Sequence, residues 1–380
     1  MKERTYKIGI SGSYGGLNLG DEAILQCIIR QLRESLSVEI TVFSRNASDT
    51  IKRHKGVRAV DVRKLTSKEI KPEIARLDLF ILGGGGILYD ADAALYLREA
   101  MTAKENHVPV MLYAIGVGPL KDAAVRATIK DVLNEADLVT VREKDAQKVL
   151  EDIGVTNEIV VTADPALLLQ PEAVPDELIN RYELEPHKKL IGISVREPGV
   201  AAPDLDENIY HGLIADAADF MIDRLDGEVI FIPMERNEKD LQHSHAVVSR
   251  MLRPQKASIL KGDYTSGQVL NFVGKLDFAL GMRLHFLIFS ALQEVPFVAL
   301  PYASKIVGLL EDLGIQTPPM QLVSAGRLIA HIDYYWDKQA ELKSLIREKL
   351  PALRERSLLT NRLLLNLLTY ADISATKQTH

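Results

Sequence analysis

The sequence is poor in features that mark several classes of protein. Cys27 is the single cysteine among 380 residues, so no disulfide can form within the chain, and its place in a helical pattern predicts a core position. No segment has the uninterrupted apolar length of a membrane span, and the amino terminus lacks the apolar region of a signal peptide. These absences predict a cytoplasmic protein.

The chain also lacks an excess of positive charge. The chain carries 46 lysines and arginines against 52 aspartates and glutamates, which gives a net charge of −6. Nucleic-acid-binding proteins usually have a basic surplus, so we expect no nucleic-acid partner, although a local basic pocket for a small anion is compatible with this balance. Hydrophobic residues make up 47% of the chain, enough for a globular protein with complete cores.

Short apolar runs alternate with amphipathic helical patterns along most of the chain, which is typical of parallel sheets covered on both faces. The alternation pauses at 169–189, a segment rich in proline and charge, and then restarts. We predict an α/β protein with two doubly wound, Rossmann-like domains that face a cleft, followed by helices. The predicted domains are residues 1–175 and 186–325, with a helical tail at 326–380, in which Pro351 breaks or starts a helix.

The segment "SGSYGGLNLGDEA" at 11–23 joins the end of a strand to a helix. It matches neither the dinucleotide fingerprint nor a phosphate-binding loop, because the glycine spacing differs and no Gly-Lys-Ser/Thr follows. Asp21 and Glu22 at a helix start would repel a phosphate, and they suit the hydroxyl groups of a sugar. A purely structural turn, with two acids that favour the helix dipole, explains the segment equally well.

The segment "ILGGGGILYD" at 81–90 places four glycines after a strand. A plain turn needs one or two, so the run predicts a close approach of the backbone to a ligand or to another part of the chain. Asp90 and Asp92 form an Asp-x-Asp pair, which binds divalent metals in some sugar transferases. Since the match is only three residues long, we predict no metal site and keep Asp90 as an acid for an acceptor.

The second half of the chain carries cationic residues just after its predicted strands. Arg196 follows "GISV", Arg283 and His285 precede a buried helix in "GMRLHFLIFSAL", and Lys305 starts the helix after "LPY". Glu235 and Asp240 follow another strand and fit helix capping, whereas a surface ion pair with Glu197 would be the plain explanation of Arg196. Cations at successive strand ends, with the amides of a helix start, predict an anion site.

With these residues the chain resembles the polysaccharide pyruvyl transferase family. The segments that carry the resemblance lie in the expected order from about residue 7 to about residue 313. The sequence departs from the family pattern in two places: the loop before Gly20-Asp21-Glu22 is longer, and Ala303 replaces an acid. The resemblance rests on "GLNLGDEAIL", "ILGGGGILYD", "ADPALLL", "GISVRE", "FIPM" and "RLHFLIFSAL".

The resemblance implies a glycosyltransferase-B-like fold and transfer of pyruvate from phosphoenolpyruvate, as a ketal, to two hydroxyls of a glycan or lipid-linked glycan, without a further cofactor. It implies a donor site in the carboxyl-terminal domain, where Arg196 and Arg283 clamp the two anionic groups, Lys305 assists, and His285 donates the proton or holds phosphate. The acceptor is expected on the amino-terminal domain, at Gly16, Asn18, Asp21, Glu22, Gly84, Gly85 and Asp90, with a base among Asp21, Glu22 and Asp90.

Two other functions fit the same architecture. A nucleotide-sugar glycosyltransferase would also carry cations for a diphosphate, and an inactive assembly partner in polysaccharide synthesis would keep the fold. The leucines of "LPALRERSLLTNRLLLNLL" at 350–368 favour packing onto the amino-terminal domain, and peripheral contact with a membrane surface is the alternative. The sequence carries no signal for the acceptor sugar, its linkage or the oligomeric state.

Overall fold

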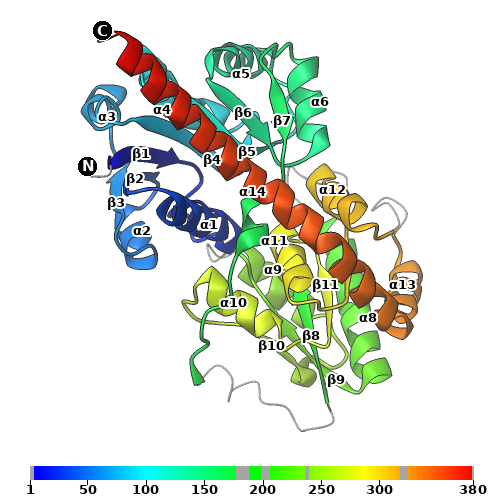
Figure 1. Ribbon diagram of the computed structural model, residues 1–380. Coiled ribbons are helices and arrows are strands. Elements are labelled where there is room, and N and C mark those ends of the chain that lie inside the picture. Colours follow the sequence, from blue (N-terminus) through cyan, green and yellow to red (C-terminus); the bar gives the residue numbers. More distant parts are fainter. Residues whose placement is uncertain (1–3, 177–187, 198–205, 236–238, 317–322, 379–380) are drawn as a thin grey trace. The chain divides into compact units, whose positions relative to one another are not determined.

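The computed structural model describes residues 4–176, 188–197, 206–235, 239–316 and 323–378 (Figure 1). The chain forms two compact units. The first comprises Met1–Gly16, Asp21–Leu169 and Leu353–His380, and the second comprises Leu17–Gly20 and Gln170–Ala352. Each unit contains one parallel sheet, so the predicted α/β class with two parallel sheets is confirmed.

The first unit is built on a seven-stranded sheet in the order β3-β2-β1-β4-β5-β6-β7, with every pairing parallel. The central strand β5 has the sequence VMLYAIGV and is buried along its whole length, which explains why its apolar run does not alternate. The strands are β1 (Tyr6–Ser11), β2 (Val38–Ser44), β3 (Arg58–Asp61), β4 (Leu79–Leu88), β5 (Val110–Val117), β6 (Leu138–Val141) and β7 (Ile159–Val161).

Helices follow the strands of this sheet, and side chains cap several of their starts. Thr66 and Glu69 form a reciprocal capping box at α3, and Asp122 accepts hydrogen bonds from two backbone amides at the start of α5. The helices are α1 (Leu19–Ser35), α2 (Ala47–Arg53), α3 (Ser67–Ile74), α4 (Ala93–Glu105), α5 (Ala123–Glu135) and α6 (Lys144–Asp152), with the short 3-10 helix η1 (Pro165–Leu168).

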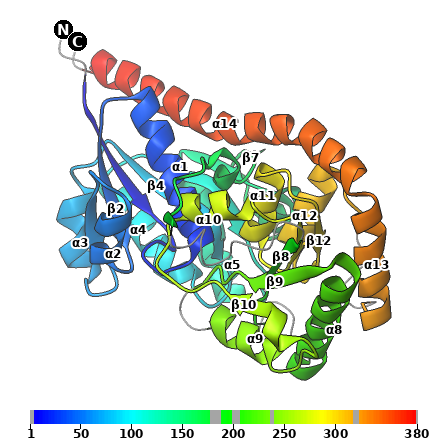
Figure 2. The same cartoon turned by 90° about the horizontal axis from the view of Figure 1, so that it is seen from below.

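The second unit repeats this plan with five parallel strands in the order β10-β9-β8-β11-β12. The strands are β8 (Lys189–Ser194), β9 (Gly227–Phe231), β10 (Ala257–Ile259), β11 (Phe278–Gly281) and β12 (Phe297–Ala299). The helices are α8 (Glu207–Leu225), α9 (Lys239–Val248), η3 (Pro254–Lys256), α10 (Ser266–Val273), α11 (Leu284–Leu292), α12 (Ser304–Leu313) and α13 (Ala325–Asp337). Figure 2 shows α13 beside α8, where Arg224 pairs with Asp333 and Asp337.

The predicted tail is helical, but the expected break at Pro351 is wrong. Pro351 lies inside the 40-residue helix α14 (Gln339–Gln378). Proline removes one helix hydrogen bond and crowds the preceding turn. Ile346, Leu350 and Leu353 are buried on either side of it, and this burial stabilises the helix across the unfavourable residue.

Two segments cross the domain boundaries predicted from the sequence. Leu17–Gly20 counts with the second unit, where the Leu19 amide donates to the Met234 carbonyl over 2.8 Å. Residues 353–380 count with the first unit, where Ser357 donates to the Asp164 carbonyl and Asn361 to Ser35.

The leucines of the tail are used in packing. Leu353, Leu364 and Leu368 are all less than 5% exposed, so this apolar face is not available to a membrane surface. No helix in the described part of the chain is long and apolar enough to cross a membrane.

Candidate active site

The site lies at the carboxyl ends of the strands of the second sheet. Strands β8 and β11 are neighbours, although β9 and β10 intervene in the sequence, so the strand order reverses between them. Ligands of doubly wound sheets bind at such a reversal. Arg196 follows β8, Arg283 follows β11, Tyr302 follows β12, and Glu235 follows β9.

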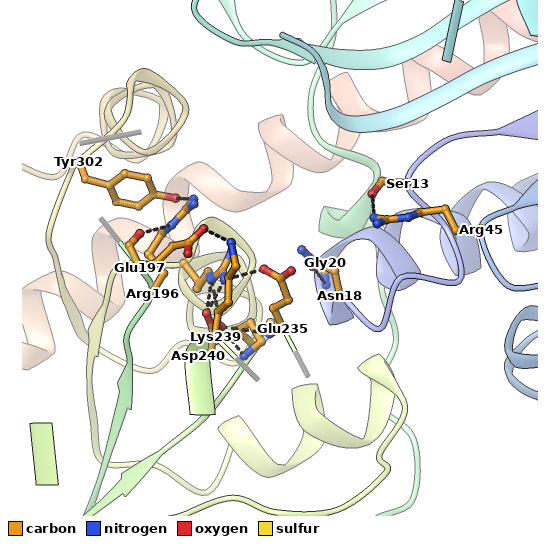
Figure 3. Close-up of polar contacts among 12 residues, drawn as sticks. Ser13, Asn18, Gly20, Arg45, Arg196, Glu197, Glu235, Lys239, Asp240 and Tyr302 are labelled. Atoms are coloured by element: carbon orange, nitrogen blue, oxygen red, sulfur yellow. Dashed lines mark hydrogen bonds and ion pairs between the residues drawn. The ribbon is translucent and has the colours of Figure 1, made fainter. Parts of the chain in front are cut away.

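Arg196 is held by its neighbours without being neutralised. Its Nη1 donates to the Tyr302 hydroxyl over 2.6 Å, its Nε donates to the Glu197 carbonyl, and its guanidinium lies 4.7 Å from the centre of the Tyr302 ring (Figure 3). It forms no ion pair with any carboxylate of the described residues; the carboxylate of Glu197 pairs with Lys239 instead. The positive charge of Arg196 is therefore available to an anionic ligand.

The backbone of Arg196 is fixed as well. Tyr210, on α8, donates its hydroxyl to the Arg196 carbonyl over 2.8 Å and accepts from the Arg196 amide over 3.2 Å. Both interactions reduce the number of conformations that this arginine can adopt. Such preorganisation lowers the entropy lost when a ligand binds.

Tyr302 is surrounded by positive charge. Burial alone would raise the pKa of its phenol, but Lys305, Arg196 and Arg283 together outweigh burial and lower the pKa below its ordinary value. Lys305 lies in the first turn of α12 and is half-buried. The charges of three cations thus act on one phenol, and all three cations are residues for which the sequence predicted an anion site.

Arg283 differs from Arg196 because it is paired inside the protein. Its Nε and Nη2 face both oxygens of Asp240, and Nη2 also donates to Glu235 over 2.8 Å. Asp240 is completely buried, and the side chain of Arg283 is only 11% exposed. Burial disfavours the charged guanidinium, but Asp240 offsets this effect and raises the pKa of Arg283.

This ion pair also shapes the loop after β9. Asp240 accepts hydrogen bonds from the backbone amides of Met234 and Glu235, at 3.1 and 3.0 Å. The helix-capping interpretation of Asp240 is thus incomplete, because one carboxylate organises a loop and holds an arginine 43 residues away. Nη1 of Arg283 makes no hydrogen bond within the described residues, so its two N–H groups can still reach a ligand.

His285 lies in the first turn of α11, two residues past the cap position occupied by Arg283. Its imidazole packs directly on Gly20, since a Cβ at Gly20 would lie 1.9 Å from Nδ1 of His285. The segment that brings Gly20 there is anchored by Ser266, whose hydroxyl donates to the Leu19 carbonyl over 2.7 Å, and by a bridge between Asn18 and Glu235. Asn18, predicted for the acceptor side, therefore joins the unit that carries the predicted donor residues.

The predicted acceptor acids of the first unit have different surroundings. Glu22 is buried, accepts from the Gly15 amide and bonds to His54 over 2.8 Å, so it holds the glycine loop together. Asp90 accepts from the amides of Lys121 and Asp122. Both carboxylates thus have structural partners. Asp21 is half-buried and lies next to Gly85.

The glycine run makes its close approach to a helix of its own unit. Gly84 and Gly85 have positive φ angles of 42° and 87°, and a Cβ at Gly84 would lie 2.1 Å from Ile24 on α1. Of the two alternatives left open by the sequence, contact with another part of the chain is thus observed. Gly16 lies near the guanidinium of Arg45.

The described residues contain no cluster of three His, Cys, Asp or Glu side chains that could hold a metal ion. Asp92, the second member of the Asp-x-Asp pair, accepts a hydrogen bond from Tyr89. On α8 and α9, His211 and His243 bond to each other over 2.8 Å.

Tyr302 belongs to the candidate site, but the sequence analysis did not single it out. Its signal was its position, directly after the apolar run that ends β12 and three residues before Lys305. A tyrosine at the end of a parallel strand lies at the same sheet edge as arginines that end neighbouring strands, so the pattern could have been noticed.

Comparisons with known proteins bear on the family and the fold of the chain. Residues 18–304 match the family model described as polysaccharide pyruvyl transferase. The chain is also 21% identical over 309 residues to the amylovoran biosynthesis protein AmsJ of Erwinia amylovora, which covers 78% of this chain and 74% of that protein.

Similar solved structures bear on the fold alone, because their sequence identity is low. Anabaena HepE, in complex with UDP and glucose, has a TM-score of 0.64 at 14% identity, over 96% of this chain and 99% of that one. UDP-GlcNAc 2-epimerase from Neisseria meningitidis, bound to UDP-GlcNAc, has a TM-score of 0.63 at 12% identity, over 96% and 100%. The expected glycosyltransferase-B-like fold is confirmed.

Proposed function

The chain belongs to the polysaccharide pyruvyl transferase family, and on that premise we propose that it transfers pyruvate from phosphoenolpyruvate to a sugar of a polysaccharide or its precursor. The product is a cyclic ketal, and phosphate is released. The observation that carries the proposal is Arg196, a preorganised guanidinium without a carboxylate partner among the described residues, beside Tyr302 and Lys305 at the strand-order reversal.

Phosphoenolpyruvate has two anionic groups, a carboxylate and a phosphate. Arg196 binds one of them through its planar fork, and Nη1 of Arg283 contributes to the other together with Lys305. The carboxylates of Asp240 and Glu235 keep Arg283 in place and limit the positive charge of the empty site. Nearby cations also offset the charge that develops on the leaving phosphate.

The reaction begins with a proton that adds to the methylene carbon of phosphoenolpyruvate. His285 donates this proton, and the adjoining carbon becomes an oxocarbenium-like centre. One sugar hydroxyl attacks that centre, the bond to the phosphate oxygen breaks, and a second hydroxyl closes the ring. Of the two hydroxyl protons, one replaces the proton that His285 gave to the methyl group, and the other leaves on the released phosphate. Asp21, which is half-buried beside Gly85, is the proposed base.

Phosphate release from phosphoenolpyruvate with a panel of glycan acceptors tests the activity. Arg196→Lys keeps the charge but loses the fork, so we expect donor binding to weaken by about 1.5–3 kcal/mol. Arg224→Lys, at an exposed ion pair of the same unit, is the matched control and should bind normally. Unchanged phosphoenolpyruvate affinity in Arg196→Lys, or protection from unfolding by UDP and not by phosphoenolpyruvate, would reject the donor assignment in favour of a nucleotide-sugar transferase.

A further inference from the structure

The first unit has a pocket that the donor chemistry does not use. It opens at the carboxyl ends of β1, β2 and β3 and is closed on one side by α4, which is the part of a doubly wound sheet where ligands bind. Its lining consists of Ser11, Gly12, Arg45, Val62, Arg63, Leu95, Tyr96, Arg98 and Glu99. Three guanidinium groups converge here in a chain whose net charge is −6.

The three arginines do different things. Arg98 is committed to the fold, because it donates to the carbonyls of Val62 and Leu65 and pairs with the buried Glu99. Arg45 and Arg63 form no ion pair with any carboxylate of the described residues, and both are exposed. The pocket therefore has a fixed wall and two guanidinium groups that a ligand can still engage.

The rest of the lining offers hydroxyl groups and a carboxylate. Arg63 lies over the Tyr96 ring at 5.6 Å, Arg45 contacts the Ser13 hydroxyl at 3.4 Å (Figure 3), and Ser11 contacts Glu99 at 3.4 Å. Burial raises the pKa of the Tyr96 phenol, while its hydrogen bond with Ser13 and the charge of Arg45 oppose that rise. Such groups match the donors and acceptors of a sugar ring.

Asp21, the carboxylate that we assign as the base, belongs to the same unit as this pocket. Its charge raises the pKa of the Tyr96 phenol, on which the charges of Arg45 and Arg63 have the opposite effect. Neutral sugars have no need of two guanidinium groups, whereas a carboxylate or phosphate group pairs with them through charge-assisted hydrogen bonds.

We propose that this pocket binds an anionic group of the acceptor glycan, with Arg45 and Arg63 as its ligands. The identification of the ligand as the acceptor glycan rests on the proposed function. The predicted binding of an anionic group to Arg45 and Arg63 does not. The anionic group has two sources with shared chemistry, the carboxylate of an acidic sugar and the phosphate that attaches a glycan to its carrier.

Ligand-detected NMR titrations of the full chain, at one ionic strength and without phosphoenolpyruvate, separate these sources. The probes are methyl glucuronide, glucose 1-phosphate and methyl glucoside. We expect at least one anionic probe to bind about tenfold or more tightly than methyl glucoside, and Arg45→Gln and Arg63→Gln each to remove about tenfold of that affinity. Arg58→Gln is the control. Arg58 lies on β3 of the same unit and pairs with Glu73 at the surface, so this variant loses the same charge away from the pocket.

Preference for the glucuronide assigns an acidic sugar, and preference for the phosphate assigns the carrier end of the glycan. Equal affinity for all three probes, or an equal loss in Arg58→Gln, would overturn the proposal. So would displacement of the anionic probe by phosphoenolpyruvate in the Arg196→Lys variant, because the pocket would then be the donor site. If phosphoenolpyruvate does not bind the wild-type chain while the anionic probe does, the proposed function fails and this pocket assignment stands.

Discussion

Replacing Gly20 by alanine tests whether the imidazole of His285 can keep its position only because residue 20 has no side chain. The added Cβ would lie 1.9 Å from Nδ1, 2.4 Å from Cγ and 2.6 Å from Cε1 of His285. These atoms belong to a rigid ring, so no flexible chain end can move aside. Either the imidazole leaves its position or the segment Leu17–Gly20 lifts away.

The size of the effect follows from two opposing contributions. Alanine is favoured over glycine inside a helix by roughly 0.5–1 kcal/mol, and Gly20 does not have a positive φ angle that would oppose the change. Overpacking of a filled site is unfavourable by typically about 1–3 kcal/mol. Gly212, in α8, provides the matched control, because a Cβ there would meet no atom within 4 Å. The helix contribution is common to both variants, so Gly20→Ala should be less stable than Gly212→Ala by the overpacking term alone, about 1–3 kcal/mol.

Urea unfolding of both variants measures the stability difference, and NMR of the His285 imidazole reports its position. We expect Gly20→Ala to shift the ring signals and to weaken phosphoenolpyruvate binding, whereas Gly212→Ala should be slightly stabilised and bind normally. A Gly20→Ala protein as stable as Gly212→Ala, with unchanged His285 signals, would falsify the packing argument.

Three other predictions concern the second unit. Tyr302→Phe removes the hydroxyl that orients Arg196, so phosphoenolpyruvate binding should weaken by about 0.5–1.5 kcal/mol, or about 2- to 12-fold, with little change in melting temperature. Tyr334→Phe, at an exposed ring, is the control. Equal affinities of the two variants would refute the orienting role of Tyr302. Asp240→Asn removes the completely buried carboxylate of the Arg283 ion pair and leaves only the partly exposed Glu235 to offset the charge. Unfolding in urea should show a loss of about 3–5 kcal/mol, and a loss below about 1 kcal/mol would contradict the buried pair. Burial, with the nearby His243 and Arg250, lowers the pKa of His211 from 6.5 to about 4. As the pH drops, the unfolded chain therefore takes up the proton first, and stability should fall from about pH 6.5 towards pH 4. His211→Gln should flatten this part of a plot of melting temperature against pH, and an unchanged slope would exclude His211 as its cause.

Much of the fold could be predicted because its signals are local. Alternating apolar runs and helical patterns indicated two parallel sheets, and glycines and cations marked the ends of strands such as β8 and β11. The cationic cluster at Arg196 and Lys305 followed from the same rule, since the carboxyl ends of parallel strands meet at one sheet edge.

The features of the site that could not be predicted depend on contacts between residues far apart in the sequence. Nothing near Arg283 indicates that Asp240 and Glu235 hold its guanidinium, and nothing near Gly84 indicates that Ile24 needs its missing side chain. The arginine pocket of the first unit combines residues from four separate elements, each of which looks like ordinary surface by itself. Pro351 misled the helix prediction because tertiary packing outweighed a local preference.

The division of the first unit into separate segments has a consequence for synthesis on the ribosome. The segment that contains most of this unit ends at Leu169, but its last segment, which is part of α14, begins at Leu353, which is 353 − 169 = 184 residues later. At roughly 5–20 residues per second, the ribosome needs roughly 9–37 s to make the intervening chain. During that time the surface that Leu353, Leu364 and Leu368 will cover is open to the surrounding medium, which makes the nascent chain a client for chaperones that bind apolar segments.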